Sequence, residues 1–356
     1  MLYLCQLLGF QSLKQRLTSR YVKPNGALGW RVRRKCFATD QNCEFCGKKG
    51  HMFRECPSLP SEPEVKIEFA QKLRGSPRIC LKEYEGMSWS KVLQYVEERG
   101  KNLNKGNPWM DDKRPLAGLR KCLGTWKAIG ASKSVLSRLA YGYQMRFFKE
   151  PGKAMFKNNV KSDKAVEDFV EQEKSKHVAD GSFVEIGVNE VQVVNPFLVS
   201  VNAAGKMRRC DDMRFVNAFM PLNVFSMQTL ARDVPNVVGV GYGMITRDLE
   251  KAYYKVPVSE SSTKSQCFFW KGKFYKAFIL LFVFCQAPFV FTRICKVIVK
   301  FCGVLLIPVI NFIDDFLFST EQAKLVELQT LGWTMSEKSN QIENTVKFLG
   351  FIIDSV

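Results

Sequence analysis

The sequence predicts an α+β fold for the larger part of the chain. A helix is expected over Asp163–Asp180, because apolar side chains share one face there, with Ser162 as the candidate N-cap and Gly181 as the stop. Val191–Val201 and Met207–Phe215 are expected to form a pair of strands joined over Ala203-Ala204-Gly205. Helical and strand patterns thus occur in one continuous region, as in domains of mixed class.

A pair of acidic residues lies in a strongly strand-like stretch, Val309–Phe318 (VINFIDDFLF). Taken alone, this stretch is typical of a hairpin whose tip carries solvated aspartates. Asp314-Asp315 lacks the glycine that two-residue turns favour, however, and adjacent carboxylates repel unless a cation lies between them. Asp248 follows a second strand-like stretch that is expected to end at Arg247. Three carboxylates at neighbouring strand ends suit two divalent metal ions of the kind that promote phosphoryl transfer.

Further motifs accompany these aspartates in a fixed order. The segment from Asp248 to Tyr253, then AP at Ala287, FIDD, LGW…EKS and KFLGFIID resemble motifs A to E of reverse transcriptases. GKMRRCDDMRFVN is similar to the R-x-x-x-D-x-R-x-x-N segment of their fingers, and the resemblance covers about residues 120–356. It implies a right-hand polymerase fold of fingers and palm, in which the three aspartates bind two Mg²⁺ and catalyse RNA-directed DNA synthesis.

The resemblance also implies roles for side chains around the aspartates. Tyr253 matches the family's steric gate, whose ring excludes a ribose 2′-hydroxyl, and an ordinary core tyrosine is the alternative. Arg208 and Lys206 would contact the nucleotide triphosphate, unless they are only solvated residues of an exposed hairpin. Phe282 lies in motif B and is expected to bind the nucleotide. Lys338 is either a general acid for the pyrophosphate leaving group or a solvated lysine.

Three departures from the family pattern favour a second interpretation. Val283 stands where motif B has a glycine that lets the backbone approach the nucleotide, and a β-branched side chain obstructs that approach. The segment between Asp315 and Gly332 is short for the family's palm helix and turn. The chain is expected to stop after motif E, without a thumb or RNase H. The alternative is therefore a catalytically inactive, decayed or co-opted nucleic-acid-binding protein.

A compact cysteine–histidine motif precedes this region. Cys43, Cys46, His51 and Cys56 have the spacing C-x2-C-x4-H-x4-C, a closed tetrahedral ligand set for one Zn²⁺. So short a motif cannot fold around an apolar core, and the metal ion must stabilise it. The motif resembles the zinc knuckle of retroviral and retrotransposon nucleocapsid segments. The side chains expected to contact unpaired bases and phosphates are Phe45, Phe53, Lys48, Lys49 and Arg54.

The composition points to a polyanionic partner. The net charge of +19 over 356 residues is most simply explained by nucleic acid, with an acidic protein surface or an anionic membrane as the weaker alternative. The resemblance implies an RNA template, a DNA primer, deoxynucleoside triphosphates and other retroelement proteins as partners. The apolar runs are too short for a membrane span, and the other cysteines form no CxxC pair. An intracellular location, in the cytoplasm or the nucleus, is expected.

Five segments are expected along the chain. Residues 1–42 form a basic arm, 43–56 the knuckle, 57–115 a linker and helical region, 116–182 a helical extension, and 183–356 the fingers and palm. Helical patterns mark Val65–Arg74 and Lys91–Arg99, and Phe348–Asp354 resembles the primer-grip strand. The preamble between Trp126 and Pro151 is similar to that of DIRS-like retrotransposons, which carry a tyrosine recombinase.

Overall fold

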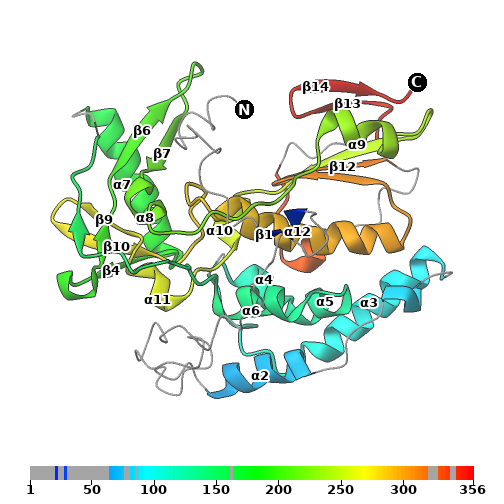
Figure 1. The fold of residues 1–356 in the computed structure, drawn as a ribbon, viewed down its shortest axis with the longest axis horizontal. Coiled ribbons are helices and arrows are strands. Elements are labelled where there is room, and N and C mark those ends of the chain that lie inside the picture. The colour runs from blue at the N-terminus through cyan, green and yellow to red at the C-terminus, as the bar shows by residue number, and fades with distance from the viewer. Residues whose placement is uncertain are drawn as a thin grey trace. The chain divides into compact units, whose positions relative to one another are not determined.

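The structure is a computed structural model that describes residues 21–22, 28–29, 64–75, 81–84, 87–114, 116–160, 163–319, 328–336 and 342–356. The chain divides into two compact units, Met1–Glu64 and Val65–Val356. In the first unit, the described residues form an antiparallel pair of short strands, β1 (Tyr21–Val22) and β2 (Leu28–Gly29). The second unit contains the remaining elements, and Figure 1 shows their order along the chain.

The second unit begins with helices that pack closely on one another. They are α2 (Glu64–Gly75), η2 (Leu81–Tyr84), α3 (Trp89–Leu103), α4 (Ala117–Lys121), α5 (Leu123–Ala128) and α6 (Lys133–Tyr141). The two helices predicted from Val65–Arg74 and Lys91–Arg99 are α2 and α3. The helices α3 and α5 cross where a Cβ atom on Gly124 would overlap the carbonyl oxygen of Gly100, so the crossing requires a glycine there.

A long helix and a five-stranded sheet follow. The helix is α7 (Lys164–Ala179), and the sheet has the order β3-β5-β9-β10-β4. Its strands are β3 (Ala154–Met155), β4 (Phe183–Ile186), β5 (Val193–Val194), β9 (Cys267–Trp270) and β10 (Lys273–Ala277). The predicted helix is confirmed, but its N-cap is Asp163 and not Ser162. Asp163 has an extended backbone, and its carboxylate accepts a hydrogen bond from the amide of Ala165 at 2.8 Å.

The predicted strand pair is confirmed only in its centre. β6 (Phe197–Val201) and β7 (Met207–Asp211) form an antiparallel hairpin, whereas β5 belongs to the five-stranded sheet. Pro196 separates β5 from β6, since proline cannot donate a ladder hydrogen bond. The strand ends early because the Asp212 carboxylate accepts from the amide of Arg214 at 3.1 Å and turns the chain into α8 (Arg214–Asn217).

A three-stranded antiparallel sheet lies over the long helix α12 (Ala287–Val304). Its order is β11-β12-β8, with β11 (Val309–Phe312), β12 (Asp315–Ser319) and β8 (Met244–Asp248). The remaining helices of the unit are short, and of these α9 contacts β11. They are η3 (Val188–Glu190), α9 (Leu230–Val237), α10 (Ala252–Lys255), α11 (Glu260–Thr263) and η5 (Leu328–Leu331). The three-stranded sheet carries the acidic residues singled out in the sequence.

The expected primer-grip strand is instead a hairpin, β13 (Thr345–Phe348) and β14 (Phe351–Asp354). Leu349 and Gly350 both have positive φ, of 51° and 85°, which is the backbone of a tight two-residue turn. In Figure 1 this hairpin lies near α9 and β12, at the end of the unit opposite β6 and β7. Within the described part of the chain, no helix combines the length and the apolar character needed to cross a bilayer.

Candidate active site

Backbone pairing brings Asp248 and Asp315 side by side. In the antiparallel pair of β12 with β8, Asp315 lies directly opposite Asp248, so their Cα atoms are about 4.5–5.5 Å apart. Asp314 precedes Asp315 in the turn between β11 and β12. All three residues are half-buried. These three residues are called the aspartate edge below.

The turn at the aspartate edge has an unusual backbone. The register places Ile313 and Asp314 in the two-residue loop, so Asp315 belongs to the strand and not to the turn as expected. Ile313 has a φ of 56°, a left-handed value that is rare for a β-branched residue and costs about 1–3 kcal/mol. Nδ2 of the Asn311 side chain donates to the Ile313 carbonyl at 2.8 Å, and the carbonyl of Asp314 accepts from the backbone amide of Leu249 at 3.2 Å. These contacts hold the tip against the end of β8.

Ser336 binds Asp248 from a separate segment. Its hydroxyl donates to Oδ2 of Asp248 at 2.8 Å, and its backbone amide donates to the Asp248 carbonyl at 2.8 Å. One carboxylate oxygen of Asp248 is thereby oriented by a neutral donor. Apart from the position of Ser336 within the motif D segment, nothing in the sequence pointed to this contact. Lys338, two residues further on, lies outside the described residues.

Tyr253 lies near the aspartate edge, on helix α10. Its ring stacks on Phe291 of α12, with ring centroids 4.7 Å apart and planes inclined by 28°. Burial, and next the negative charge of Asp314, raise the pKa of Tyr253 above its ordinary value. The phenol therefore stays protonated at neutral pH. The chain turns from β8 into α10 through Lys251, whose φ of 48° is left-handed.

The loop of residues 281–286, called the motif B loop below, is held by Asn217. The Asn217 side-chain amide donates to the Val283 carbonyl at 3.0 Å, and its oxygen accepts from the Cys285 amide at 3.0 Å. Phe282 is 45% exposed, whereas Val283 is half-buried against the main core. Val283 has no positive φ, so its backbone conformation does not require a glycine.

In the hairpin of β6 and β7, the neighbouring residues Arg208 and Arg209 lie on opposite faces of β7. Arg208 on β7 and Lys206 in the turn before it are exposed, as an interaction with a ligand in solution requires. The sheet of β6 and β7 is separate from the sheet that carries the aspartate edge. Arg209 points the other way and is buried. Its guanidinium lies 2.6 Å from the Asp211 carboxylate and 3.8 Å from the centre of the Phe268 ring. The burial of Arg209 follows from strand alternation, but its ion pair could not be read from the sequence.

The donor chemistry of the aspartate edge suits magnesium, because Mg²⁺ prefers carboxylate oxygens. The side chains are not already gathered around one point, however. Among the residues that the structure describes, no group of three or more His, Cys, Asp or Glu side chains is arranged to hold a metal ion. The predicted zinc ligands and their base-binding and phosphate-binding neighbours, Cys43, Phe45, Cys46, Lys48, Lys49, His51, Phe53, Arg54 and Cys56, all lie outside the described residues.

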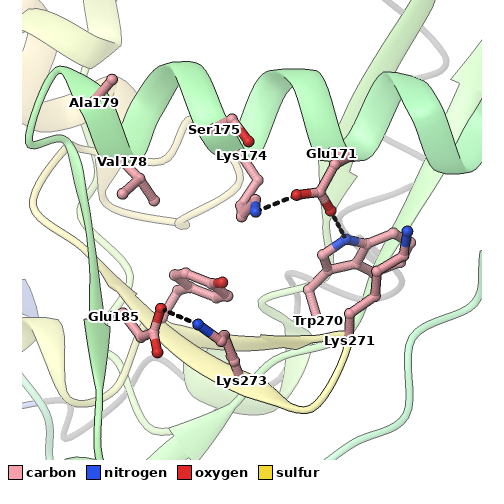
Figure 2. Close-up of a pocket in the computed structure, with 10 residues that line it drawn as sticks. Glu171, Lys174, Ser175, Val178, Ala179, Glu185, Trp270, Lys271 and Lys273 are labelled. Atoms are coloured by element: carbon pink, nitrogen blue, oxygen red, sulfur yellow. Dashed lines mark hydrogen bonds and ion pairs between the residues drawn. The ribbon is translucent and has the colours of Figure 1, made fainter.

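A separate cavity of about 470 Å³ opens between α7 and the turn of β9 and β10. Figure 2 shows Glu171 between Lys174 of the same helix and the indole of Trp270, whose Nε1 donates to Glu171 at 3.0 Å. Lys273 pairs with Glu185 at 3.0 Å on the opposite wall. The lining includes none of the aspartates, and its charges largely neutralise one another. The cavity is therefore no part of the candidate active site.

Comparisons with known proteins agree with this geometry at the level of the fold. No family model and no curated protein matches the chain. Among solved structures, it is similar to a prototype foamy virus protease-reverse transcriptase, a selenomethionine-labelled CSH mutant. The TM-score is 0.50 at 21% sequence identity, over 59% of this chain and 29% of that chain. The native form of the same protein gives a TM-score of 0.47 at 22% identity, over 58% of this chain and 28% of that one.

The similarity to these solved structures covers only part of their length. The chain spans less than a third of the length of these two foamy virus chains. At such low sequence identity, the likeness concerns the fold and not the activity. The mixed α+β architecture, the paired aspartates and this likeness agree. The chain has a reverse-transcriptase-like fold.

Proposed function

We propose that the protein is an RNA-directed DNA polymerase, a nucleotidyltransferase of a retrotransposon of the DIRS-like kind. One observation carries the proposal most directly. Asp315 lies opposite Asp248 in the register of β12 and β8, and Asp314 occupies the adjoining turn. Three carboxylates on one strand edge are the donor set that two-metal nucleotidyl transfer needs. Bound at these residues, Mg²⁺ would supply Lewis acidity toward the primer hydroxyl and the triphosphate.

The chain's own side chains would divide the remaining tasks. Ser336 orients Asp248, and Tyr253, whose phenol is protonated, presents a half-buried ring near Asp314 that would exclude a ribose 2′-hydroxyl. Arg208 and Lys206 are exposed and available to triphosphate oxygens. Phe282 offers an exposed ring to the nucleotide base. Lys338 would donate a proton to the leaving pyrophosphate.

The proposed partners are an RNA template, a DNA primer, deoxynucleoside triphosphates and other retroelement proteins. The surplus of 53 basic over 34 acidic residues supports a polyanionic partner. We assign one Zn²⁺ to Cys43, Cys46, His51 and Cys56, from their spacing alone. Phe45, Phe53, Lys48, Lys49 and Arg54 would then contact unpaired bases and phosphates.

Primer extension on the full chain tests the polymerase proposal. Wild type is compared with Asp315→Asn on a homopolymeric RNA template with a DNA primer and Mg²⁺. We expect extension by wild type and a loss of more than about 100-fold in the variant, since even outer-shell partners of a metal are worth about 10–100-fold. Asp168→Asn is the matched control, because Asp168 is an exposed acid on α7. If Asp315→Asn and Asp168→Asn extended the primer equally well, the aspartate edge would not be the active site.

A second function is favoured by Val283, which occupies the motif B position where the resemblance expects glycine. A chain that keeps the fold but cannot align a nucleotide would be a non-catalytic nucleic-acid-binding protein. It would bind primer–template yet extend nothing. Val283→Gly separates the two functions, because a gain of extension supports an obstructed polymerase. Binding without extension in both wild type and Val283→Gly supports the binding protein.

A further inference from the structure

Four aromatic rings form a continuous series from the candidate active site to the N-terminal helices. Tyr253 stacks on Phe291, and Phe291 meets Trp333 edge-on at 5.7 Å between ring centroids. Trp333 then meets Trp126 of α5 edge-on at 6.4 Å. We call these four residues the aromatic series. It joins α10, α12, the turn after η5 and the helical extension, which are far apart in the sequence.

The far end of the series is firmly anchored. Nε1 of Trp126 donates to the carbonyl of Leu331 at 2.9 Å. Next to this bond, α4 approaches the same turn so closely that a Cβ atom on Gly118 would lie 2.7 Å from the carbonyl oxygen of Gly332. Gly332 itself has a φ of 88°, which favours glycine. The extension therefore contacts the turn that carries Trp333 through a hydrogen bond and a backbone approach.

The two tryptophans contribute in different ways. Trp126, Phe291 and Trp333 are all buried, with exposed fractions of 0%, 0% and 3%. Unlike the indole of Trp126, the Nε1 of Trp333 has no hydrogen-bond partner among the described atoms. A buried donor without an acceptor is unfavourable, so Trp333 is not explained by its N–H group. Its large ring fills the space between Phe291 and Trp126.

We propose that residues 116–141 are a positioning element for Tyr253, acting through Trp126, Trp333 and Phe291. Protein interiors are close-packed, and a displaced ring in such a series shifts its neighbours. If the protein is the polymerase proposed above, on which this inference rests, Trp126 also contributes to the selection of deoxynucleotides over ribonucleotides. Trp126 and Trp333 are then positioning residues, because neither reaches the substrate.

The test uses the full chain labelled with 3-fluorotyrosine and read by ¹⁹F NMR. Tyr253→Phe identifies the Tyr253 resonance, whose shift reports the ring current of Phe291. We expect Trp126→Leu to move this resonance. Trp126→Phe, which keeps a ring but loses the bond to Leu331, should move it less and guards against misfolding of the leucine variant. Trp109→Leu is the matched control, since Trp109 is a buried tryptophan of the segment before the extension and lies outside the series.

Nucleotide selection gives the second readout. In Trp126→Leu, we expect the ratio of kcat/KM for deoxynucleotide over ribonucleotide to fall about three- to tenfold, the factor that one aromatic pair supplies. Trp109→Leu should leave the ratio unchanged. A Tyr253 resonance that moves equally in Trp109→Leu, or in neither Trp126 variant, would overturn the inference. If the resonance moves as expected but wild type extends no primer, the polymerase proposal fails and the positioning of Tyr253 stands.

Discussion

His177 illustrates how a single residue acquires a role from its surroundings. It lies near the end of α7 and is 3% exposed, with its ring 4.9 Å from that of Phe183 and 5.1 Å from that of Tyr254. Nδ1 lies 3.4 Å from the Asp180 carboxylate, but no well-aligned hydrogen bond joins them. Burial lowers the pKa of His177 and outweighs Asp180, which raises it. This environment is typical of a packing residue and not of a catalyst.

Stability should therefore depend on pH through His177. The folded state takes up a proton on His177 only at a lower pH than the unfolded chain, in which histidine titrates near pH 6.5. The unfolded state then binds more protons, so the free energy of unfolding should fall as the pH drops from about 7.5 to about 5.5, by at most about 1.4 kcal/mol per pH unit. Urea unfolding across this range checks the slope. His177→Gln should flatten it, and an unchanged slope in the variant would assign the dependence to other groups.

Helix α12 shows how an element ends at a strained residue. Leu306 follows the C-cap with a φ of 54°, and the amide of Ile307 donates to the carbonyl of Cys302 at 2.9 Å. This pattern favours glycine at the position of Leu306. The Leu306 side chain is 87% exposed, so it contributes almost no packing. The end of α12 thus carries a backbone cost that no contact of Leu306 offsets.

Replacing this residue should stabilise the protein. Leu306→Gly is expected to raise the free energy of unfolding by about 0.5–1 kcal/mol, because glycine adopts the left-handed conformation without steric cost. Denaturant unfolding of the full chain measures the change. Leu306→Ala serves as the control, since it removes the side chain but keeps the Cβ atom and the strain. A gain of the same size in the alanine variant would show that backbone strain is not the cause.

Elements encoded by neighbouring residues could be predicted. The alternation around Asp314 and Asp315 indicated a hairpin, and the apolar face of Asp163–Asp180 indicated α7. Local turn chemistry was harder, since the Asp212 side chain converts the end of a predicted strand into α8. The primer-grip stretch folded back on itself for a similar reason, at Leu349 and Gly350. A single strand and a tight hairpin share the same alternation of side chains.

Contacts between distant segments could not be predicted. The sequence placed three aspartates at strand ends, but only the register shows Asp315 opposite Asp248. Ser336 and the buried pair of Arg209 with Asp211 became visible only in the fold, because polar residues give no sign of their distant partners. The chemical roles of the aspartates, Tyr253 and Arg208 remain predictions. So do those of Lys338 and the zinc ligands, which the described residues do not include.

At the scale of the whole molecule, charge should govern association. The chain carries a net charge of +19, and residues 1–42 contain eight Lys or Arg against one acid. Binding to mixed-sequence RNA should weaken steeply between about 50 and 200 mM salt, because each phosphate contact releases counterions. Fluorescence anisotropy at several salt concentrations measures the slope of log K against log salt. Deleting residues 1–42 should make the slope shallower. If the affinity of the full chain for RNA did not change with salt, the positive charge would serve to bind a partner other than nucleic acid.

The candidate site forms only when β8 pairs with β12 during folding, because this pairing brings Asp248 to Asp315. The β11–β12 hairpin is local and forms from adjacent residues, whereas β8 must reach β12 across the segment that contains β9, β10 and α12. Closing so long a loop is entropically costly, and non-local strand pairing slows folding. The hairpin alone brings together only Asp314 and Asp315. A partly folded chain therefore lacks the complete aspartate edge, and the pairing of β12 with β8 is the step that completes it.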